Sequence, residues 1–232
     1  MVFVFLFIFG LVIGSFLNVV ALRYDPEKDI FDLKNLGGRS HCTQCRRALR
    51  WYELVPILSF VFLLGKCRTC KEKISWQYPI VEFLTALVFI SPAYFLDFYH
   101  PNYIVASILV LALLAFILLS LIDLKFYIIP DSINIFLAFL GIIRILTLYL
   151  VDTTSYLNTS FLGGYALLFS LSENLWLNYI MASLFGFLFF GMIIYITKGR
   201  GMGMGDLKLI TVLGLLLGWP DILLIILFSF VI

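Results

Sequence analysis

Charged residues are scarce in this sequence. They make up 13% of its 232 residues, whereas 62% of the residues are hydrophobic, and the mean hydropathy is +1.07. Soluble domains contain about 25% charged residues, so this composition excludes an ordinary soluble globule and also a disordered chain. The net charge of only +2 gives no reason to expect a nucleic-acid partner. The composition indicates instead a polytopic membrane protein with one modest polar insert.

Long apolar runs divide the sequence. A membrane-spanning helix needs about 20 mostly apolar residues. Five runs of this size carry at most one charged residue each, and two shorter runs follow them: 1–22, 76–96, 103–122, 132–150, 174–197, and then 209–220 and 222–232. The first positive charge, Arg23, comes after the first run, so this run resembles a retained helix more than a cleaved signal. We therefore expect an all-α polytopic membrane protein with about seven to eight transmembrane helices.

Basic residues gather in one polar insert. Eleven of the 16 lysines and arginines lie between Arg23 and Lys73. Because short cytoplasmic loops hold most of the positive charge in membrane proteins, the insert is predicted to be cytoplasmic. If Asp123 and the loop 198–208 lie on that same side, an even number of membrane crossings separates them. The runs 132–150 and 174–197 supply two, so segment 152–173 is expected not to cross the membrane and to form an external loop or an interfacial helix. The expected domains are a first transmembrane helix (1–22), a cytoplasmic insert (23–75) and a membrane domain (76–232).

Only four cysteines occur, all in this insert, as Cys42-x-x-Cys45 and Cys67-x-x-Cys70. Two such hooks, 21 residues apart, favour a closed zinc site with four thiolate ligands. A closed site is structural because no coordination position is left for water. The alternative of two disulfides is disfavoured by a reducing cytoplasm. His41 could replace one thiolate, although four sulfurs already suffice.

Three aspartates stand beside apolar runs. Asp123 ends one run, and Asp206 follows the glycine-rich residues 201–205, in which Gly203 and Gly205 are expected to form a catalytic loop. Asp131 follows a proline and is more simply explained as a helix N-cap. Alternating glycines let a backbone bend and approach a ligand closely, which exceeds what a simple cap at Asp206 needs.

Asp123 and Asp206 lie at the predicted cytoplasmic ends of two different helices and suggest a catalytic pair. Two carboxylates that share a site do not ionise together easily, so one can activate water while the protonated one polarises a carbonyl. This is the chemistry of an aspartic protease. No serine, cysteine or histidine arrangement competes with it, since His41 and His100 lack plausible partners.

Taken together and in order, these motifs resemble those of the prepilin peptidases, or type IV leader peptidases. The resemblance covers nearly the whole chain. It rests on Gly-Ser-Phe-Leu-Asn-Val-Val at 14–20, Arg-Ser-His-Cys at 39–42, Arg-Trp-Tyr-Glu-Leu-Val-Pro at 50–56, Ile-Ser-Trp-Gln-Tyr-Pro at 74–79, Ile-Asp-Leu at 122–124, Pro-Asp at 130–131 and Gly-Met-Gly-Met-Gly-Asp-Leu-Lys at 201–208. The last run contains the Gly-x-Gly-Asp motif of that family. The family usually has about one helix more than these runs account for, and segment 151–174 is longer than it would lead us to expect.

The resemblance implies an enzyme of the bacterial cytoplasmic membrane. Such an enzyme removes the basic leader of prepilin or pseudopilin substrates after a glycine, with Asp123 and Asp206 as the catalytic aspartates. It implies that S-adenosylmethionine then supplies a methyl group to the new N-terminus, a reaction associated with the cysteine insert. Two alternatives stay open, namely a related peptidase without methyl transfer and a non-enzymatic protein that handles ions or protons.

Two features of the sequence carry weaker hypotheses. Glu82 lies inside an apolar run and could face the catalytic cavity, assist methyl transfer or bind a neighbouring helix. The insert carries 11 basic and 6 acidic residues, so anionic lipid headgroups are its expected partner. An acidic cluster within it could hold a basic leader: Asp25, Glu27, Asp29 and Asp32.

Overall fold

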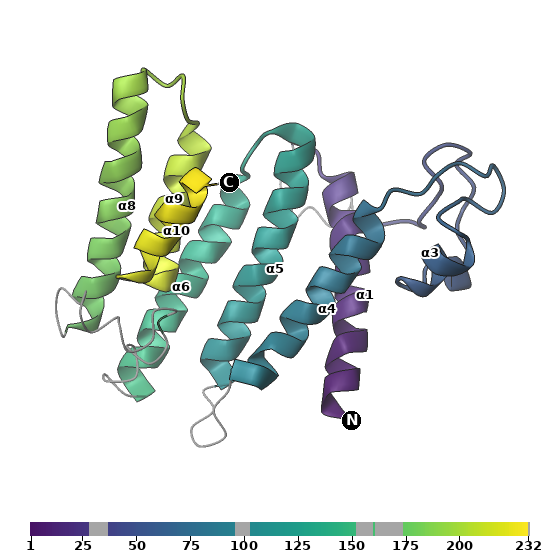
Figure 1. Ribbon diagram of the computed structural model, residues 1–232, viewed down its shortest axis with the longest axis horizontal. Helices are drawn as coiled ribbons and strands as arrows, with labels where there is room; N and C mark the ends of the chain where they lie inside the picture. Colours follow the sequence, from purple (N-terminus) through teal and green to yellow (C-terminus); the bar gives the residue numbers. More distant parts are fainter. Residues whose placement is uncertain (28–36, 96–102, 152–159, 161–173, 232) are drawn as a thin grey trace. The chain divides into compact units, whose positions relative to one another are not determined.

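The computed structural model describes residues 1–27, 37–95, 103–151, 160 and 174–231. Within these residues the secondary structure is helical, apart from two isolated β-bridges in the insert. The chain forms two compact units, Met1–Tyr127 and Ile128–Ile232. Figure 1 shows the helices of each unit in sequence colours.

The first unit holds three long helices. These are α1 (Val2–Arg23), α4 (Gln77–Phe95) and α5 (Tyr103–Phe126), and each packs against the other two (Figure 1). Between α1 and α4 the insert contains the short 3-10 helix η1 (Trp51–Glu53) and the five-residue helix α3 (Leu58–Phe62).

Small residues allow α1 and α4 to approach closely. A Cβ added at Gly10 would lie 2.6 Å from the Cα of Ala86, and one at Gly14 would lie 2.7 Å from the Cα of Glu82. Glycines four residues apart give a helix a flat face on which a neighbouring backbone can lie. Asn18, which is fully buried one turn further on, donates to the carbonyl oxygen of Gly14 at 3.2 Å. It also donates to the carbonyl oxygen of Tyr78 on α4 at 3.4 Å, so side-chain hydrogen bonding supplements van der Waals packing at this apolar interface.

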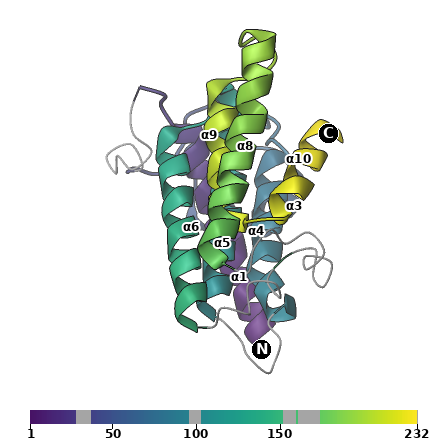
Figure 2. The same ribbon diagram turned by 90° about the vertical axis from the view of Figure 1, so that its left-hand side faces the viewer.

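The second unit holds α6 (Asp131–Val151), α8 (Leu175–Thr197), α9 (Met204–Leu217) and α10 (Asp221–Val231). Helix α9 packs against both α6 and α8, and Figure 2 shows α8 and α9 side by side. A Cβ at Gly214 would lie 2.5 Å from the Cα of Ser183, so the α8–α9 contact also depends on a glycine. The helix that begins with the Gly-x-Gly-Asp motif is thus held from two sides.

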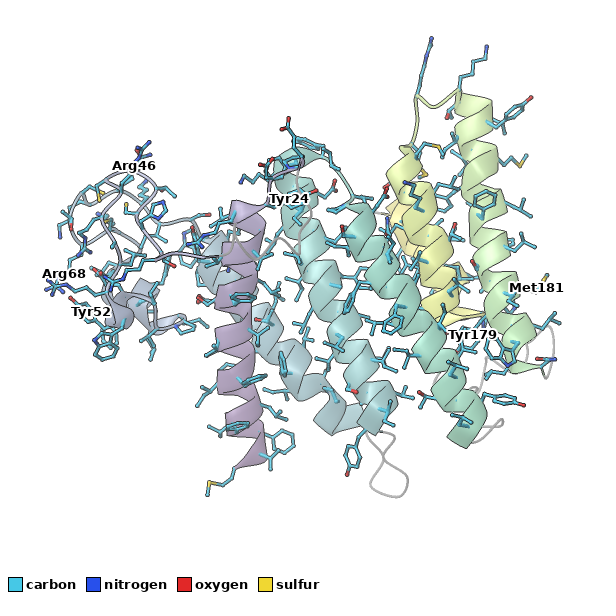
Figure 3. The ribbon with its side chains drawn as sticks, turned by 180° about the vertical axis from the view of Figure 1, so that it is seen from behind. Tyr24, Arg46, Tyr52, Arg68, Tyr179 and Met181 are labelled. Carbon is cyan, nitrogen blue, oxygen red and sulfur yellow. The ribbon has the colours of Figure 1, made fainter. Side chains whose placement is uncertain are left out.

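A buried arginine closes the far end of α9. The Arg144 side chain of α6 is 2% exposed and donates to the carbonyl oxygens of Leu216 and Leu217. Its guanidinium carbon lies 5.7 Å from the centre of the Tyr179 ring, which Figure 3 labels on α8. The last carbonyls of a helix lack partners within the helix and carry partial negative charge. Arg144 therefore supplies both the donors and the positive charge that this helix end requires.

The helices confirm the predicted fold class, an all-α membrane protein with a four-cysteine insert. Among the described residues, four helices are long and apolar enough to span a membrane, namely α1, α5, α6 and α8. The predicted run 76–96 corresponds to the shorter apolar helix α4, and the runs 209–220 and 222–232 overlap α9 and α10. Segment 152–173, expected to be an external loop or interfacial helix, lies outside the described residues except for Ser160. The predicted domain limits and membrane orientation stay predictions.

Candidate functional site

The four cysteines converge on one point in the insert. The sulfur atoms of Cys42, Cys45, Cys67 and Cys70 all lie within 4.8 Å of one another. The Sγ atoms of Cys42 and Cys70 are 3.8 Å apart. Four sulfurs on a tetrahedral zinc ion with Zn–S bonds of about 2.3 Å would be separated by about 3.8 Å. The cluster therefore fits a closed S₄ zinc site, and the four thiols are not paired as disulfides.

The two cysteine hooks repeat one another at an offset of 25 residues. The backbone N–H of Cys42 donates to the carbonyl of Arg47, and that of Cys67 donates to the carbonyl of Glu72. In the fourth position after the first cysteine, Arg46 and Lys71 both adopt positive φ, 53° and 59°. Two further pairs of backbone hydrogen bonds match at the same offset. The N–H groups of Arg46 and Lys71 donate to the carbonyls of Cys42 and Cys67, and those of Leu49 and Ile74 donate to the carbonyls of Ser40 and Gly65. Sequence reasoning found the two Cys-x-x-Cys motifs but missed this repeat around them.

Hydrogen bonds set the protonation of the thiols. Backbone N–H groups of Cys70 and Thr69 lower the pKa of Cys67 to about 6. The Cys70 sulfur accepts a hydrogen bond from the backbone N–H of Glu72, which lowers its pKa, but desolvation and the neighbouring thiols outweigh this effect and raise the pKa to about 11. The sequence suggested that basic side chains would favour the thiolates, whereas backbone amides have the largest effect at Cys67. Four thiolates this close repel one another, so a cation among them is needed for all four to ionise.

Glu53 braces the first hook from within the insert. Its side chain is buried and accepts hydrogen bonds from the Arg47 side chain at 2.5 Å and from the Arg50 N–H at 2.8 Å. Burial raises the pKa of Glu53, but the hydrogen bonds from Arg50 and Arg47 outweigh this effect and hold the pKa below its usual value. The ion pair fixes η1 against the turn that carries Cys42 and Cys45.

Glu82 joins the insert to α4. Its side chain is 6% exposed, and its Oε2 accepts the backbone N–H of Ile57 at 2.7 Å. Ile57 precedes α3 and has φ of +56°, a conformation that β-branched residues rarely adopt. Of the three roles considered for Glu82, the structure supports hydrogen bonding, both to the backbone of the insert at Ile57 and to the side chain of Ser15 on the neighbouring helix α1.

The two predicted catalytic aspartates lie near helix ends, one in each compact unit. Asp123 lies in the last turn of α5 and is exposed. Asp206 lies in the first turn of α9 and is half-buried, and its Oδ2 accepts the backbone N–H of Gly203 at 3.1 Å. Asp206 is therefore the third residue of the helix and bonds back to the N-cap Gly203. This bond holds the carboxylate over the glycine loop.

The loop glycines serve different purposes. In this turn Lys198 and Gly199 have positive φ, at 52° and 74°, whereas Gly203 has an ordinary extended φ of −82°. A Cβ added at Gly205 would lie 3.2 Å from the Cβ of Ile129. The sharp bend expected at the alternating glycines therefore occurs before them, and Gly205 is needed for close packing.

Lys208 pairs with Asp131, which sequence reasoning did not anticipate. The Lys208 Nζ donates to both carboxylate oxygens of Asp131, at 2.8 and 3.0 Å. Asp131 is the first residue of α6, and the carbonyl of Pro130 accepts the first helical N–H groups, so Asp131 is not the N-cap. The signal available in the sequence was Lys208 two residues after Asp206 in the glycine motif.

Two sequence hypotheses fall partly outside the described residues. In the acidic cluster, Asp25 and Glu27 are described, and Asp25 Oδ1 accepts the Glu27 N–H at 3.2 Å. Asp29 and Asp32 lie outside the described residues, as does His100. The proposed binding of a basic leader by this cluster stays a prediction.

The fold and the cysteine cluster define a polytopic helical membrane protein with an insert whose four cysteines could hold a metal ion. Residues 8–96 match the bacterial peptidase A24 N-terminal domain, and residues 109–232 match the type IV leader peptidase family. The chain therefore belongs to the type IV leader peptidase family, as the motifs predicted. This is a family of enzymes, so the predicted membership in the prepilin peptidases is confirmed at the level of the family.

Curated relatives agree with this assignment. The chain is 33% identical to a prepilin leader peptidase/N-methyltransferase of Myxococcus xanthus, over 97% of the chain and 59% of that protein's length. Relatives of the same name in Bacillus subtilis and Klebsiella pneumoniae are 35% and 30% identical, over 92% and 93% of the chain. The chain spans 73% and 85% of these two proteins. No solved structure matches the chain.

Proposed function

We propose that this chain cleaves the leader peptide of type IV prepilin-like proteins at the cytoplasmic membrane face and then methylates the new N-terminus. The observation that carries the proposal is the position of Asp123 and Asp206 in the family motifs, each near the end of an apolar helix. Both ends are cytoplasmic in the orientation that the basic residues predict. The relatives named for both activities support the same reading.

In the proposed cleavage, the two carboxylates share one proton. The ionised one accepts a proton from water as the water oxygen attacks the scissile carbonyl, and the protonated one donates a hydrogen bond to the carbonyl oxygen. The C–N bond then breaks, and a carboxyl proton moves to the leaving amine. The hydrogen bond from Gly203 restrains the Asp206 carboxylate, so less reorganisation is needed when the substrate binds.

The cofactors have different support. Cys42, Cys45, Cys67 and Cys70 would hold zinc as a structural ion, which would fix the two hooks of the insert together. S-adenosylmethionine would supply an electrophilic methyl group for the amine that cleavage releases. We assign it no binding residues, since no cradle for it can be identified among the described residues.

Mass spectrometry of a prepilin-type substrate tests the proposal. The purified protein is incubated in detergent with substrate and S-adenosylmethionine, beside Asp123→Asn and Asp206→Asn variants. Asp131→Asn is the matched control, because it makes the same change at a third aspartate, which pairs with Lys208 near the glycine motif. We expect leader loss and an added methyl group with the wild type, no cleavage with the first two variants, and measurable cleavage with the control.

The outcomes separate the alternatives. Cleavage without an added methyl group would leave a peptidase whose insert is only structural. Cleavage that survives in either Asp123→Asn or Asp206→Asn would overturn the dyad. An intact substrate with folded wild-type protein would favour the non-enzymatic alternative.

A further inference from the structure

Residues 51–64 of the insert present apolar side chains outward. The sole charged residue of this segment, Glu53, is buried and paired with Arg47. Six large apolar side chains are exposed: Trp51, Leu54, Leu58, Val61, Phe62 and Leu64, with Phe62 82% and Leu64 84% exposed. We call these six side chains the apolar face. An exposed face of this kind on an otherwise polar insert marks a surface that meets another apolar phase.

The fold fixes the depth of this face along the membrane helices. Glu82 bonds Ile57, and it lies five residues into α4, about 7 Å along the helix from its start at a rise of 1.5 Å per residue. Figure 1 shows α3 beside the upper part of α1, below the end at which the chain leaves α1 for the insert. The chain therefore descends from the cysteine hooks to the level of the second turn of α4.

Exposed basic and aromatic residues flank the apolar face in the sequence. Arg68 donates to the Tyr52 hydroxyl at 2.7 Å, and Figure 3 shows both residues at the outer edge of the insert. The other exposed basic residues nearby in sequence are Arg46, Arg50, Lys66, Lys71 and Lys73. Trp76, 69% exposed just before α4, packs against Phe60 with ring centres 4.9 Å apart and the ring planes tilted by 58°. Aromatic belts and basic collars are typical of the boundary between headgroups and acyl chains.

We propose that residues 51–64 dock the insert onto the bilayer, with the apolar face in the boundary between headgroups and acyl chains. The insert joins α1, which is long and apolar enough to span a membrane, to the shorter apolar helix α4, so both of its ends are held at the bilayer when these two helices lie in it. Interfacial segments sit about 5–10 Å into that boundary, which agrees with the depth of Ile57 beside Glu82. The inference concerns a lipid-docking surface and does not depend on the reaction proposed above.

Added tryptophans in nanodiscs test this docking. Phe62→Trp places a reporter on the apolar face, and Gln44→Trp places a matched reporter on the exposed turn of the first cysteine hook. Each is reconstituted in phosphatidylcholine/phosphatidylglycerol nanodiscs, with and without bromine on the upper acyl chains. The emission of the unaltered protein is subtracted, and retained zinc shows that the insert is folded.

We expect brominated lipid to quench about half or more of the Phe62→Trp emission and to leave the Gln44→Trp emission unchanged. Red-shifted and unquenched emission from Phe62→Trp would place the face in water and overturn the proposal. Blue-shifted but unquenched emission would mean that protein covers the face, which also overturns it. If Phe62→Trp loses zinc, Leu58→Trp replaces it, because Leu58 is 54% exposed on the same face.

Discussion

Lys208 donates to both carboxylate oxygens of Asp131, and this pair links the first turns of α9 and α6. The two side chains are 52% and 65% exposed, and ion pairs in such positions stabilise proteins by about 0–1 kcal/mol. Lys208 nevertheless lies two residues from Asp206, in the same helical turn. The pair therefore bears more on the position of that turn than on the stability of the fold.

We predict that Lys208→Met slows leader cleavage up to about tenfold, equivalent to at most 1.4 kcal/mol of transition-state stabilisation, while leaving Tm nearly unchanged. The physical reason is that the turn carrying Asp206 loses its tie to α6. Single-turnover cleavage rates and thermal unfolding in detergent measure the two effects. A swapped pair, Asp131→Lys with Lys208→Asp, should recover part of the rate. A loss of Tm without a loss of rate would contradict the positioning role.

Asp206 has a structural and a proposed catalytic role, and two substitutions separate them. Asp206→Asn keeps an oxygen that can accept the Gly203 N–H, whereas Asp206→Ala removes the acceptor. We expect both to lower the cleavage rate by about 10²–10⁴-fold, the usual contribution of an acid or base. Only Asp206→Ala should also lower the free energy of unfolding, by about 1 kcal/mol. Cleavage rates beside denaturation curves test this, and an active Asp206→Asn variant would refute it.

Glu82 offers a test of hydrogen bonding against charge. Glu82→Gln keeps an oxygen for the Ile57 N–H, whereas Glu82→Met is similar in size and leaves that N–H without its acceptor. An unsatisfied buried donor costs about 1–3 kcal/mol, so we expect Glu82→Met to speed amide exchange of residues 57–62. Hydrogen–deuterium exchange measures this, together with the ratio of methylated to cleaved product.

If the hydrogen bond is the role of Glu82, the Gln variant behaves like the wild type in both measurements. If Gln and Met variants lose methylation equally while cleavage persists, the negative charge is required. That result would favour the methyl-transfer role considered for Glu82.

Gly14 is predicted to be intolerant of a side chain. A Cβ there would lie 2.0 Å from the Thr85 Oγ1 and 2.7 Å from the Cα of Glu82, so α1 and α4 would have to separate. We expect Gly14→Ala to cost about 1–3 kcal/mol, the usual range for overpacking. Gly203→Ala is the control, because its nearest neighbour, Asp206 Oδ2, would lie 3.5 Å away. Equal Tm values for the two variants in detergent would contradict this account of the α1–α4 contact.

Removal of the proposed zinc ion should act on the insert alone. We expect Cys67→Ser, or treatment with a strong chelator, to abolish zinc binding and to remove amide protection around both hooks, because either change disrupts the S₄ site. Helix content should persist, since the α1–α4 and α8–α9 contacts do not involve the cysteines. Zinc analysis, amide exchange and circular dichroism measure these effects, with Thr43→Ser as the control. If the wild-type protein instead contains no zinc and its cysteines have lost their thiol hydrogens, the cysteines are paired, and this result would favour the disulfide alternative.

The sequence by itself determined the long apolar helices and the cluster of four cysteines. A span must be long and uncharged to lie in hydrocarbon, so runs such as 103–122 and 174–197 identify α5 and α8 with little ambiguity. Two Cys-x-x-Cys motifs likewise specify a cluster of four sulfurs, because each short turn already brings two thiols together. Local chemistry is sufficient for these features.

Only the tertiary structure decided which residues meet across the fold. An apolar helix is hydrophobic on every face, so its sequence does not show which face packs against a neighbour. The pairs Lys208 with Asp131, Arg144 with the end of α9, and Glu82 with Ile57 were invisible for this reason. Close contacts at glycines such as Gly14 and Gly214 bring these backbones together, and the polar side chains find partners only once the helices have packed.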